Sequence, residues 1–513
     1  MGAMTWPARP CRRLLSLVSS GVVLLALSVQ AGPALAGVPP VPIPEGPDQG
    51  SVPQFVGHPA TPKSISVAPT PRNPHMAPNG RSNIHADAYM TDSYTWGGPL
   101  GNGIQVTSTF QSADCASLTF DSAGNLVTIC VGLEGPRLMM FDPVSLETLG
   151  QLSLPPRDPA CGSSVFTDFS GGGYFYLDDQ DRAVVPTTTR EIWIVAETGL
   201  PWPAPGFELQ QAYDLSSAVP PDDCVISVLP DWSGRLWFAT VHGVVGTVDP
   251  VTGAVASVTL GGEAIGNSFA VDETGGVFVV SDHAMYRFDP DPATGAPVQT
   301  WRETYDRGTR LKPGQTNFGS GTTPTLIGSQ YLAITDNADP FMHVVVFRRE
   351  AQVSGTRLVC QVPVFGATRG ATENSLIAAG PSLVVENNYG YTGPSSTMNG
   401  GVTEPGVARV DIAANGSGCR KRWTNDAERI PTTVSKVSLA TGLIYAYTKP
   451  PESNGADAWY LTAIDFRNGH TVYSQLAGTD LGFNNNYAPV TLGSDGAAYV
   501  GALGGLVELR DAG

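Results

Sequence analysis

The feature that most restricts the fold of this chain is a repeated unit of four short β-strands. Each copy shows a strand, a Gly- or Asp-containing hairpin, two further strands, a Gly-containing turn and a fourth strand. The clearest copies are residues 227–260 and 269–305. The first hairpins of eight copies centre on Ala123, Gln180, Ser233, Thr274, Gly328, Gly380, Thr441 and Ser494. Units of this size cannot bury both faces alone, so the repeat predicts an all-β, eight-bladed β-propeller.

The copy around Gln180 is the weakest of the eight. If residues 165–215 were an insertion, the ring would have seven blades, which is the alternative prediction. The last copy, residues 488–511, lacks a fourth strand, while residues 103–111 form a strand that belongs to no copy. Pairing 103–111 with 504–511 would hide both exposed strand edges. We therefore expect an N-terminal strand to complete the last blade and close the ring.

The repeat resembles the blades of quinoprotein-type propellers, in which a "dG-x-vYvg" strand pair precedes a "xD-xx-tG-xxxW" turn and strand. The matching residues are Asp495-Gly496…Tyr499-Val500-Gly501, Asp465-Phe466-Arg467-Asn468-Gly469 and Asp249-Pro250-Val251-Thr252-Gly253. The resemblance implies the propeller fold with eight blades and names pyrroloquinoline quinone (PQQ) as an alternative cofactor. Two departures argue against the quinone. The chain has no Cys-Cys pair, and only Trp301 and Trp423 supply the fourth-strand tryptophan.

The N-terminal 36 residues have the pattern of a secretory signal peptide. Three arginines precede the apolar stretch 14–29, and Ala34-Leu35-Ala36 supplies a small-residue cleavage site. Residues 37–88 hold many prolines and are expected to be an extended, weakly ordered leader before a propeller domain at 89–513. The polar segment around His75, His85 and Asp87 is expected to fold back over a propeller face. We expect a secreted protein, extracellular or periplasmic.

The charge balance excludes some partners. The chain carries 29 Lys+Arg against 46 Asp+Glu, a formal net charge of −17. Nucleic acids and anionic membranes select basic surfaces, so neither is expected as a partner. No segment after the signal peptide is long and apolar enough to span a bilayer. We expect a monomer that binds a small molecule or a carbohydrate.

Six cysteines follow the signal peptide, and an even number in an exported chain predicts disulfides. Pairing Phe120 with Asn125 across the first hairpin and counting outward places Cys115 opposite Cys130. Cys161 and Cys224 both precede the first strands of adjacent blades two and three. Cys360 and Cys419 both lie on fourth strands of adjacent blades five and six. These three pairs are the predicted disulfides.

Long loops rich in oxygen-bearing side chains recur at two positions of the repeat. They are the lead-in loops, which precede the first strand of a blade, and the loops between the second and third strands. In a propeller these loops emerge on one face around the channel, where binding sites on rigid scaffolds are found. The expected ligand-binding residues are Asn337, Asp339, Asn374, Asn387, Asn388, Tyr389, Asn484, Asn485, Asn486, Lys436 and Arg310.

Carboxylate and amide oxygens are also the ligands of Ca²⁺. The loop composition is similar to that of gluconolactonase-like propellers, which hold a central calcium. It suggests Glu373, Asp336, Asn267 and Asn486 as metal ligands. The alternative is that these Asn and Asp residues form tight turns, which both residue types favour. Calcium is the expected cofactor and PQQ the alternative.

Candidate catalytic residues are Asp336, Glu373, Glu386 and His283. A pair of carboxyl groups can flank a glycosidic bond as acid and base, and a histidine can move protons. The favoured hypothesis is a metal-assisted hydrolase or lyase acting on a sugar- or lactone-like molecule. The alternatives are a quinoprotein-like oxidoreductase and a non-catalytic propeller that binds protein or glycan through an exposed Tyr389/Tyr391 patch.

Overall fold

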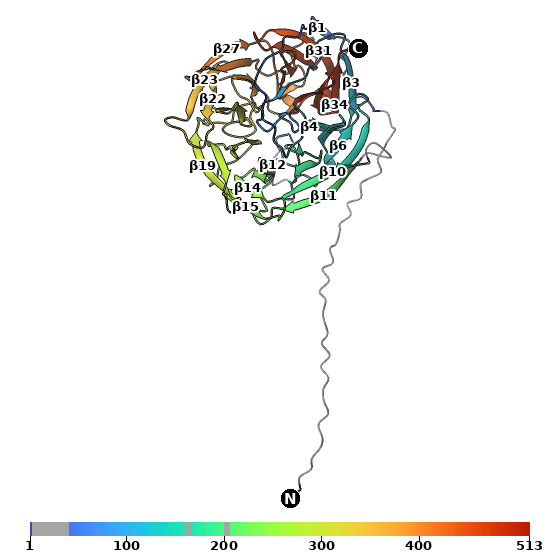
Figure 1. Ribbon diagram of the computed structural model, residues 1–513. Helices are drawn as coiled ribbons and strands as arrows, with labels where there is room; N and C mark the ends of the chain where they lie inside the picture. The colour runs from blue at the N-terminus through green and yellow to red at the C-terminus, as the bar shows by residue number, and fades with distance from the viewer. Residues whose placement is uncertain (3–39, 159–160, 162–165, 200–205, 513) are drawn as a thin grey trace. The chain divides into compact units, whose positions relative to one another are not determined.

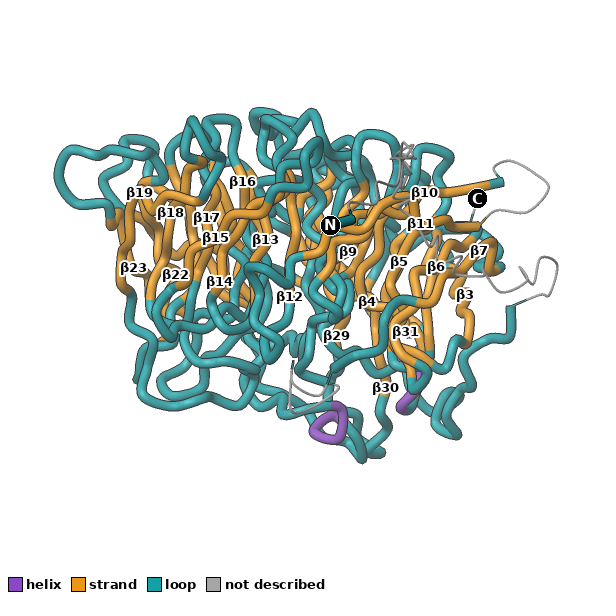
Figure 2. Tube along the Cα trace, turned by 90° about the horizontal axis from the view of Figure 1, so that it is seen from below, coloured by secondary structure: helices purple, strands orange, loops and turns teal. Residues whose placement is uncertain are grey.

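The computed structural model describes residues 1–2, 40–158, 161, 166–199 and 206–512. The expected signal peptide lies outside these residues, apart from Met1 and Gly2. The described chain from residue 40 onward belongs to one compact unit, Ala31–Gly513, built from mainly antiparallel sheets arranged in a ring. Figure 1 shows the ring along its axis, and Figure 2 shows from the side that the strands run between two faces formed by loops.

The first four blades are regular four-stranded sheets. Blade 1 contains β4 (Ala113–Phe120), β5 (Leu126–Gly132), β6 (Gly135–Phe141) and β7 (Thr148–Ser153), and blade 2 contains β8 (Tyr176–Leu177), β9 (Ala183–Pro186), β10 (Glu191–Thr198) and β11 (Gly206–Asp214). Blade 3 contains β12 (Val225–Pro230), β13 (Leu236–Thr240), β14 (Val244–Val248) and β15 (Val255–Thr259), and blade 4 contains β16 (Ala270–Val271), β17 (Val277–Val280), β18 (Ala284–Pro290) and β19 (Pro297–Thr304).

Blades 5 to 8 complete the ring, and blade 8 is the one that joins the two ends of the propeller. Blade 5 contains β20 (Thr325–Ile327), β21 (Tyr331–Thr335), β22 (Met342–Arg348) and β23 (Leu358–Val364), and blade 6 contains β24 (Ile377–Ala379), β25 (Ser382–Glu386), β26 (Val407–Ile412) and β27 (Cys419–Asn425). Blade 7 contains β28 (Lys436–Ser438), β29 (Leu443–Thr448), β30 (Ala458–Asp465) and β31 (Thr471–Thr479), and blade 8 contains β32 (Val490–Leu492), β33 (Ala498–Ala502), β34 (Gly505–Arg510) and β3 (Gln105–Phe110).

The eight-bladed prediction is confirmed, and each of the eight predicted hairpins joins the first two strands of one blade. The seven-bladed alternative is wrong. The four strands of blade 2 lie within residues 165–215, so this stretch is not an insertion.

The predicted closure is also confirmed. β3 pairs antiparallel with β34 from Gln105↔Arg510 to Phe110↔Gly505, so the N-terminal strand becomes the outer strand of blade 8. Asp511 reinforces the junction, since its carboxylate accepts the backbone N–H groups of Leu100, Gly101 and Asn102 at 2.7–3.0 Å. The two ends of the propeller sequence are therefore held in one sheet.

Residues 40–94, called the leader segment below, comprise the described part of the expected leader 37–88, which was predicted to be weakly ordered, and the six residues that follow it. The segment is extended and paired with the propeller. Its strand β1 (Phe55–Gly57) pairs with β31 on the outside of blade 7, and β2 (Ser93–Tyr94) pairs with β28 on the inside. The first strands of five blades donate backbone N–H groups to it at 2.8–3.1 Å, from Leu177, Val271, Leu326, Ala378 and Val437 to the carbonyls of Ser82, Ala88, Tyr89, Thr91 and Asp92. The segment thus covers the inner strand edges that would otherwise be unpaired around the centre of the ring (Figure 1).

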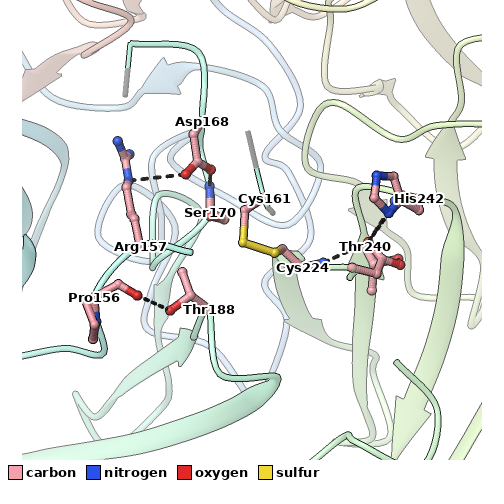
Figure 3. The surroundings of a disulfide bond; sticks show 10 residues. Pro156, Arg157, Cys161, Asp168, Ser170, Thr188, Cys224, Thr240 and His242 are labelled. Carbon is pink, nitrogen blue, oxygen red and sulfur yellow. Dashed lines mark hydrogen bonds and ion pairs between the residues drawn. A yellow bond between two sulfur atoms is a disulfide. The ribbon is translucent and has the colours of Figure 1, made fainter. Parts of the chain in front are cut away.

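All three predicted disulfides are present, joining Cys115 to Cys130, Cys161 to Cys224 and Cys360 to Cys419. The Cys161–Cys224 bridge joins the segments that lead into blades 2 and 3 (Figure 3). The counted register of the first hairpin was wrong by one residue, because Phe120 pairs with Leu126 and not Asn125. A β-bulge between Cys115 and Ser117 absorbs the extra residue, which restores the Cys115↔Cys130 pairing.

Three disulfides are compatible with an extracellular protein, since such bonds persist in oxidising compartments. Over the described residues, none of the helices has the length and apolar character needed to cross a membrane.

Replacing both Cys115 and Cys130 by alanine is expected to lower the free energy of unfolding by about 3 kcal/mol, because the bridge closes a loop of 15 residues in the unfolded chain. Equilibrium denaturation of the variant beside the parent protein measures this difference. An unchanged denaturation midpoint would contradict a structural role for the bridge.

Candidate functional site

A cavity of about 820 Å³ opens on one face of the propeller. Its wall combines lead-in segments of blades 1, 2, 5, 6, 7 and 8, second-to-third-strand hairpins of blades 1 and 8, and two pieces of the leader segment. The short 3₁₀ turn η2 (Leu481–Phe483), whose Leu481 lines the cavity, lies on the lower face in Figure 2. The cavity is centred further toward blades 1, 2 and 8 than the long loops of the sequence suggested.

His85 lines this cavity and is held by a buried carboxylate behind it. Its Nδ1 lies 3.1 and 3.3 Å from the two carboxylate oxygens of Asp92, and the Ser375 hydroxyl donates to Asp92 Oδ2 at 2.6 Å. In the tautomer in which Nδ1–H donates to Asp92, Nε2 is the unprotonated nitrogen of the ring. Nε2 is buried and has no hydrogen-bond partner within the described residues. The imidazole is therefore held from behind by Asp92, while Nε2 has no partner among the described residues.

Asp92 is itself anchored by Lys436, and both side chains are fully buried. The Lys436 ammonium is bonded to Asp92 Oδ1 and donates to the carbonyl of Ile84 at 2.6 Å. Burial alone would raise the pKa of Asp92, but Lys436 and His85 together hold that pKa below its usual value. Asp92 is therefore a carboxylate at neutral pH, and Lys436, expected as a ligand-binding residue, serves as its counter-ion.

Glu373, in the lead-in loop of blade 6, is another titratable group that lines the cavity. Its Oε1 accepts the backbone N–H of Thr316 at 2.6 Å, while Oε2 is buried with no partner among the described residues. Burial raises the pKa of Glu373 to about 8, so the side chain is mostly a neutral acid at pH 7. The backbone of Glu373 is fixed by Asn388, whose Oδ1 accepts its N–H at 2.9 Å.

Glu386 lies behind the cavity wall and does not line it. Its Oε2 accepts from Asn374 Nδ2 at 2.7 Å and its Oε1 accepts the backbone N–H of Ser435 at 2.8 Å. Burial raises the pKa of Glu386 to about 7. Both oxygens are occupied, so Glu386 positions Asn374, which lines the cavity, and is not placed to act on a ligand there.

Aromatic rings form another part of the wall. Phe169 makes edge contacts with Tyr174 and Tyr487, with ring centroids 6.5 and 5.2 Å apart, and all three line the cavity. The Tyr174 hydroxyl donates to Asn267 Oδ1 at 3.1 Å. Asn486 lines the cavity beside them and accepts the Tyr391 hydroxyl at 2.8 Å.

Of the candidate catalytic, ligand-binding and metal-ligating residues of the sequence analysis, Glu373, Asn374 and Asn486 line this cavity. A second group lies apart from it, in the lead-in loop and hairpin of blade 5. There Asp336 binds the His343 ring at 2.7 Å, Asn337 donates to the carbonyl of Arg310 at 3.0 Å, and the Arg310 guanidinium pairs with Asp339 at 3.3 Å. These side chains hold one loop against another.

The other predicted amides also fix loops. Asn387 donates to backbone carbonyls of Arg369 and Pro405, Asn388 to that of Ile430, Asn484 to that of Pro394, and Asn485 to those of Ala488 and Gly501, all at 2.9–3.1 Å. His283 pairs with Asp282 at 2.8 Å outside the cavity. Tyr391 is buried and Tyr389 only partly exposed, so the expected exposed tyrosine patch does not form.

The suggested calcium ligands do not converge. Glu373 and Asn486 line the cavity, but Asn267 is bonded to Tyr174, and both carboxylate oxygens of Asp336 are bonded to His343. Over the described part of the chain, no three His, Cys, Asp or Glu side chains are grouped as a metal site. The four residues therefore do not fit a calcium site.

Sequence reasoning did not connect His85, Asp92, Ser375 and Lys436, which meet from the leader segment and blades 6 and 7. The signal that could have found them is the polar stretch 73–92, which contains His75, His85, Asp87 and Asp92 and follows the Pro-rich residues. Their partners are about 280–350 residues away in the chain, and only the closed ring brings them together.

Comparisons with known proteins add little to this geometry. No protein-family model matches the chain, so the resemblance to quinoproteins stays at the level of the propeller fold. An uncharacterised protein of Archaeoglobus fulgidus is 27% identical over 338 residues, which cover 60% of this chain and 64% of that protein. The chain thus spans slightly less than two thirds of the length of this relative.

Similar solved structures include a streptogramin B lyase, with 9% identity, 79% of this chain and 97% of that chain covered, and a TM-score of 0.40. A functionally unknown protein from Desulfotomaculum acetoxidans has 12% identity, 67% and 91% coverage, and a TM-score of 0.39. A chain of the mitotic checkpoint complex has 14% identity, 65% and 87% coverage, and a TM-score of 0.38. TM-scores this low support no inference about the function of this chain.

Proposed function

We propose that this protein is a hydrolase or lyase that acts on a small organic molecule, with His85 as general base and Glu373 as general acid. The observation that carries the proposal is that a carboxylate-oriented imidazole and a neutral buried carboxylic acid line the same cavity, each with one unpartnered polar atom. Pairs of groups whose surroundings separate their protonation states in this way are typical of acid–base catalysis.

The base is prepared by its surroundings. Asp92 accepts the Nδ1 proton of His85, so Nε2 can take a proton from a bound water or from an acidic C–H of the substrate. The Asp92 carboxylate then lies against the positive imidazolium and stabilises it. Lys436 and Ser375 keep Asp92 in place while the proton moves.

The acid completes the proton balance. Glu373 carries its proton at pH 7 and can donate it from Oε2 to the oxygen that leaves when a C–O bond breaks. In ester or lactone hydrolysis, His85 takes a proton from the attacking water. In elimination, it takes the proton from the carbon next to a carbonyl. In both reactions His85 gains the proton that Glu373 later recovers through solvent.

The proposal is tested with γ-nonalactone for hydrolysis and 4-acetoxybutan-2-one for elimination. Wild-type protein is expected to turn over at least one probe, and His85→Gln and Glu373→Gln are each expected to lower kcat by about 10²–10⁴-fold. Because the acid must be protonated, kcat is expected to fall as pH rises above about 8, the pKa of Glu373.

His283→Gln is the matched control, because His283 also has a carboxylate on Nδ1 but lies outside the cavity. It is expected to leave kcat unchanged, and melting curves verify that each variant is folded. Failure of the wild type on both probes, or full activity of His85→Gln and Glu373→Gln, would overturn the assignment.

Two further measurements on the same purified protein test the alternative functions. Stoichiometric calcium by elemental analysis would return a metal to the mechanism, and a quinone absorption band would favour an oxidoreductase. Neither signal, with no turnover of either probe, would favour a non-catalytic binding propeller.

A further inference from the structure

The mouth of the cavity is unusually apolar. Four large hydrophobic side chains that line it are exposed to solvent, namely Phe110, Leu133, Phe166 and Leu481. Leu133, at the β5–β6 hairpin, has its whole side chain exposed. Clustered apolar side chains at the mouth of a pocket are typical of ligand contact, whereas scattered ones need no explanation. A ligand with a hydrophobic body would cover them.

The charged groups around the same cavity are mostly acidic. Among its described lining residues, Arg157 is opposed by the carboxyl groups of Glu45, Asp114, Glu134, Asp168 and Asp480, while Glu373 is mostly neutral at pH 7. Arg157 is already engaged, since its guanidinium lies 3.7 Å from Asp168, next to the Cys161–Cys224 bridge (Figure 3). An anionic ligand would meet this acidic wall, and a cationic one would be attracted by it.

Asp114 is the carboxyl group best placed for such a cation. It lies on β4, where it pairs with Val131, two residues before the exposed Leu133 in the sequence. Its Oδ1 is buried without a hydrogen-bond partner in the described residues. Burial raises the pKa of Asp114 to about 7, with Arg157 opposing that rise. Glu373, only 7% exposed, lines the same cavity and also keeps one oxygen unpartnered, but as a mostly neutral acid at pH 7 it adds no full negative charge. The rings of Phe169, Tyr174 and Tyr487 complete a wall that suits a cation.

We infer that the ligand of this cavity is a hydrophobic organic amine, with its apolar body on the rim formed by Phe110, Leu133, Phe166 and Leu481 and its ammonium group against Asp114. The inference rests on the cavity of the proposed function, and it adds the class of substrate. The reacting part of the molecule then extends toward His85 and Glu373.

Three probes that differ only in their head group test this inference. They are 4-phenylbutylamine, 4-phenylbutan-1-ol and 4-phenylbutanoate, titrated calorimetrically at pH 7 and low salt. The amine is expected to bind about 10-fold more tightly than the alcohol, and the carboxylate is expected to bind most weakly. A cation beside Asp114 lowers the pKa of that group, so amine binding is also expected to release a proton, seen as a binding enthalpy that depends on the buffer.

Two variants locate the two halves of the ligand. Asp114→Asn is expected to remove both the preference for the amine and the proton release, while leaving alcohol binding unchanged. Leu133→Ser is expected to weaken all three probes by a similar factor of about 5. Val251→Ser, an exposed apolar residue in a turn of blade 3, and Glu303→Gln, an acid outside the cavity, are the matched controls and should bind like wild type.

Equal affinity for amine and alcohol, tighter binding of the carboxylate, or an amine preference that survives Asp114→Asn would overturn the inference. So would failure of all three probes to bind. The two proposals can fail separately. Amine binding that depends on Asp114, with no turnover of γ-nonalactone or 4-acetoxybutan-2-one, would refute the enzyme and keep the ligand class. Turnover that depends on His85, with no preference for the amine, does the reverse.

Discussion

A chain that ends at Gly504 is expected to lose its cooperative unfolding transition. The deletion removes β34, which pairs with β33 on one side and with β3 on the other. It also removes Asp511, whose carboxylate binds three backbone N–H groups ahead of β3. Blade 8 would be left without its third strand, and β3 would have no partner.

The size of the effect follows from the side chains of the missing strand. Leu506, Val507 and Leu509 are completely buried. Their burial is worth about 1.5–3 kcal/mol each, or about 5–9 kcal/mol together, before lost backbone pairing is counted. The entire free energy of unfolding of a typical domain is about 5–15 kcal/mol, so the ring is not expected to survive the loss.

Thermal or urea unfolding followed by near-ultraviolet circular dichroism measures the result. A chain that ends at Asp511, and so keeps β34 and the cap on residues 100–102, is the control and should unfold like the full chain. A Gly504-terminated protein with the midpoint of the full chain would show that closure contributes little.

The features of the fold that the sequence predicted are those encoded locally and repeated. Each hairpin has its own turn residues, so eight hairpins and an orphan strand were sufficient to infer the ring and its closure. The disulfides could be predicted because each cysteine pair lies at corresponding positions of one blade or of adjacent blades. The bulge at Cys115 and Ser117 could not, since an extra residue in a strand leaves no mark in an alternating pattern.

The site was only partly predictable, because contacts between distant parts of the chain are not encoded locally. Glu373 was singled out because a turn does not readily explain a glutamate, and it lines the cavity. The asparagines around it were singled out by composition, and most of them fix backbone carbonyls of neighbouring loops. Composition cannot distinguish an amide that holds a loop from one that holds a ligand, because both need the same donor and acceptor.

The leader segment explains why the remaining residues were missed. It crosses the first strands of five blades and brings His85 and Asp92 to partners on blades 6 and 7. A segment with no repeat of its own has no register that the sequence alone can supply. The burial of the leader segment also links folding to the proposed chemistry, because Asp92 and Lys436, which orient the proposed base, also help to hold this segment inside the ring.

Replacing Lys436 by methionine is therefore expected to lower the free energy of unfolding by about 3–5 kcal/mol, the usual result of leaving a buried charge without its partner. Lys436 and Asp92 are both completely buried, and the Lys436 ammonium is the one full positive charge bonded to this carboxylate among the described residues. Without it, Asp92 must either stay charged in an apolar setting or take up a proton, and each alternative costs stability.

A double-mutant cycle separates the ion pair from simple loss of packing. Asp92→Asn with Lys436→Met removes both charges, so the double variant is expected to be more stable than the sum of the two single losses predicts. Lys63→Met is the control, because Lys63 pairs with Asp465 at 3.8 Å on the surface, and it should change stability by less than about 1 kcal/mol. A Lys436→Met protein within 1 kcal/mol of wild type in urea unfolding, or strictly additive losses in the cycle, would show that Asp92 does not depend on this lysine and that another group anchors the proposed base.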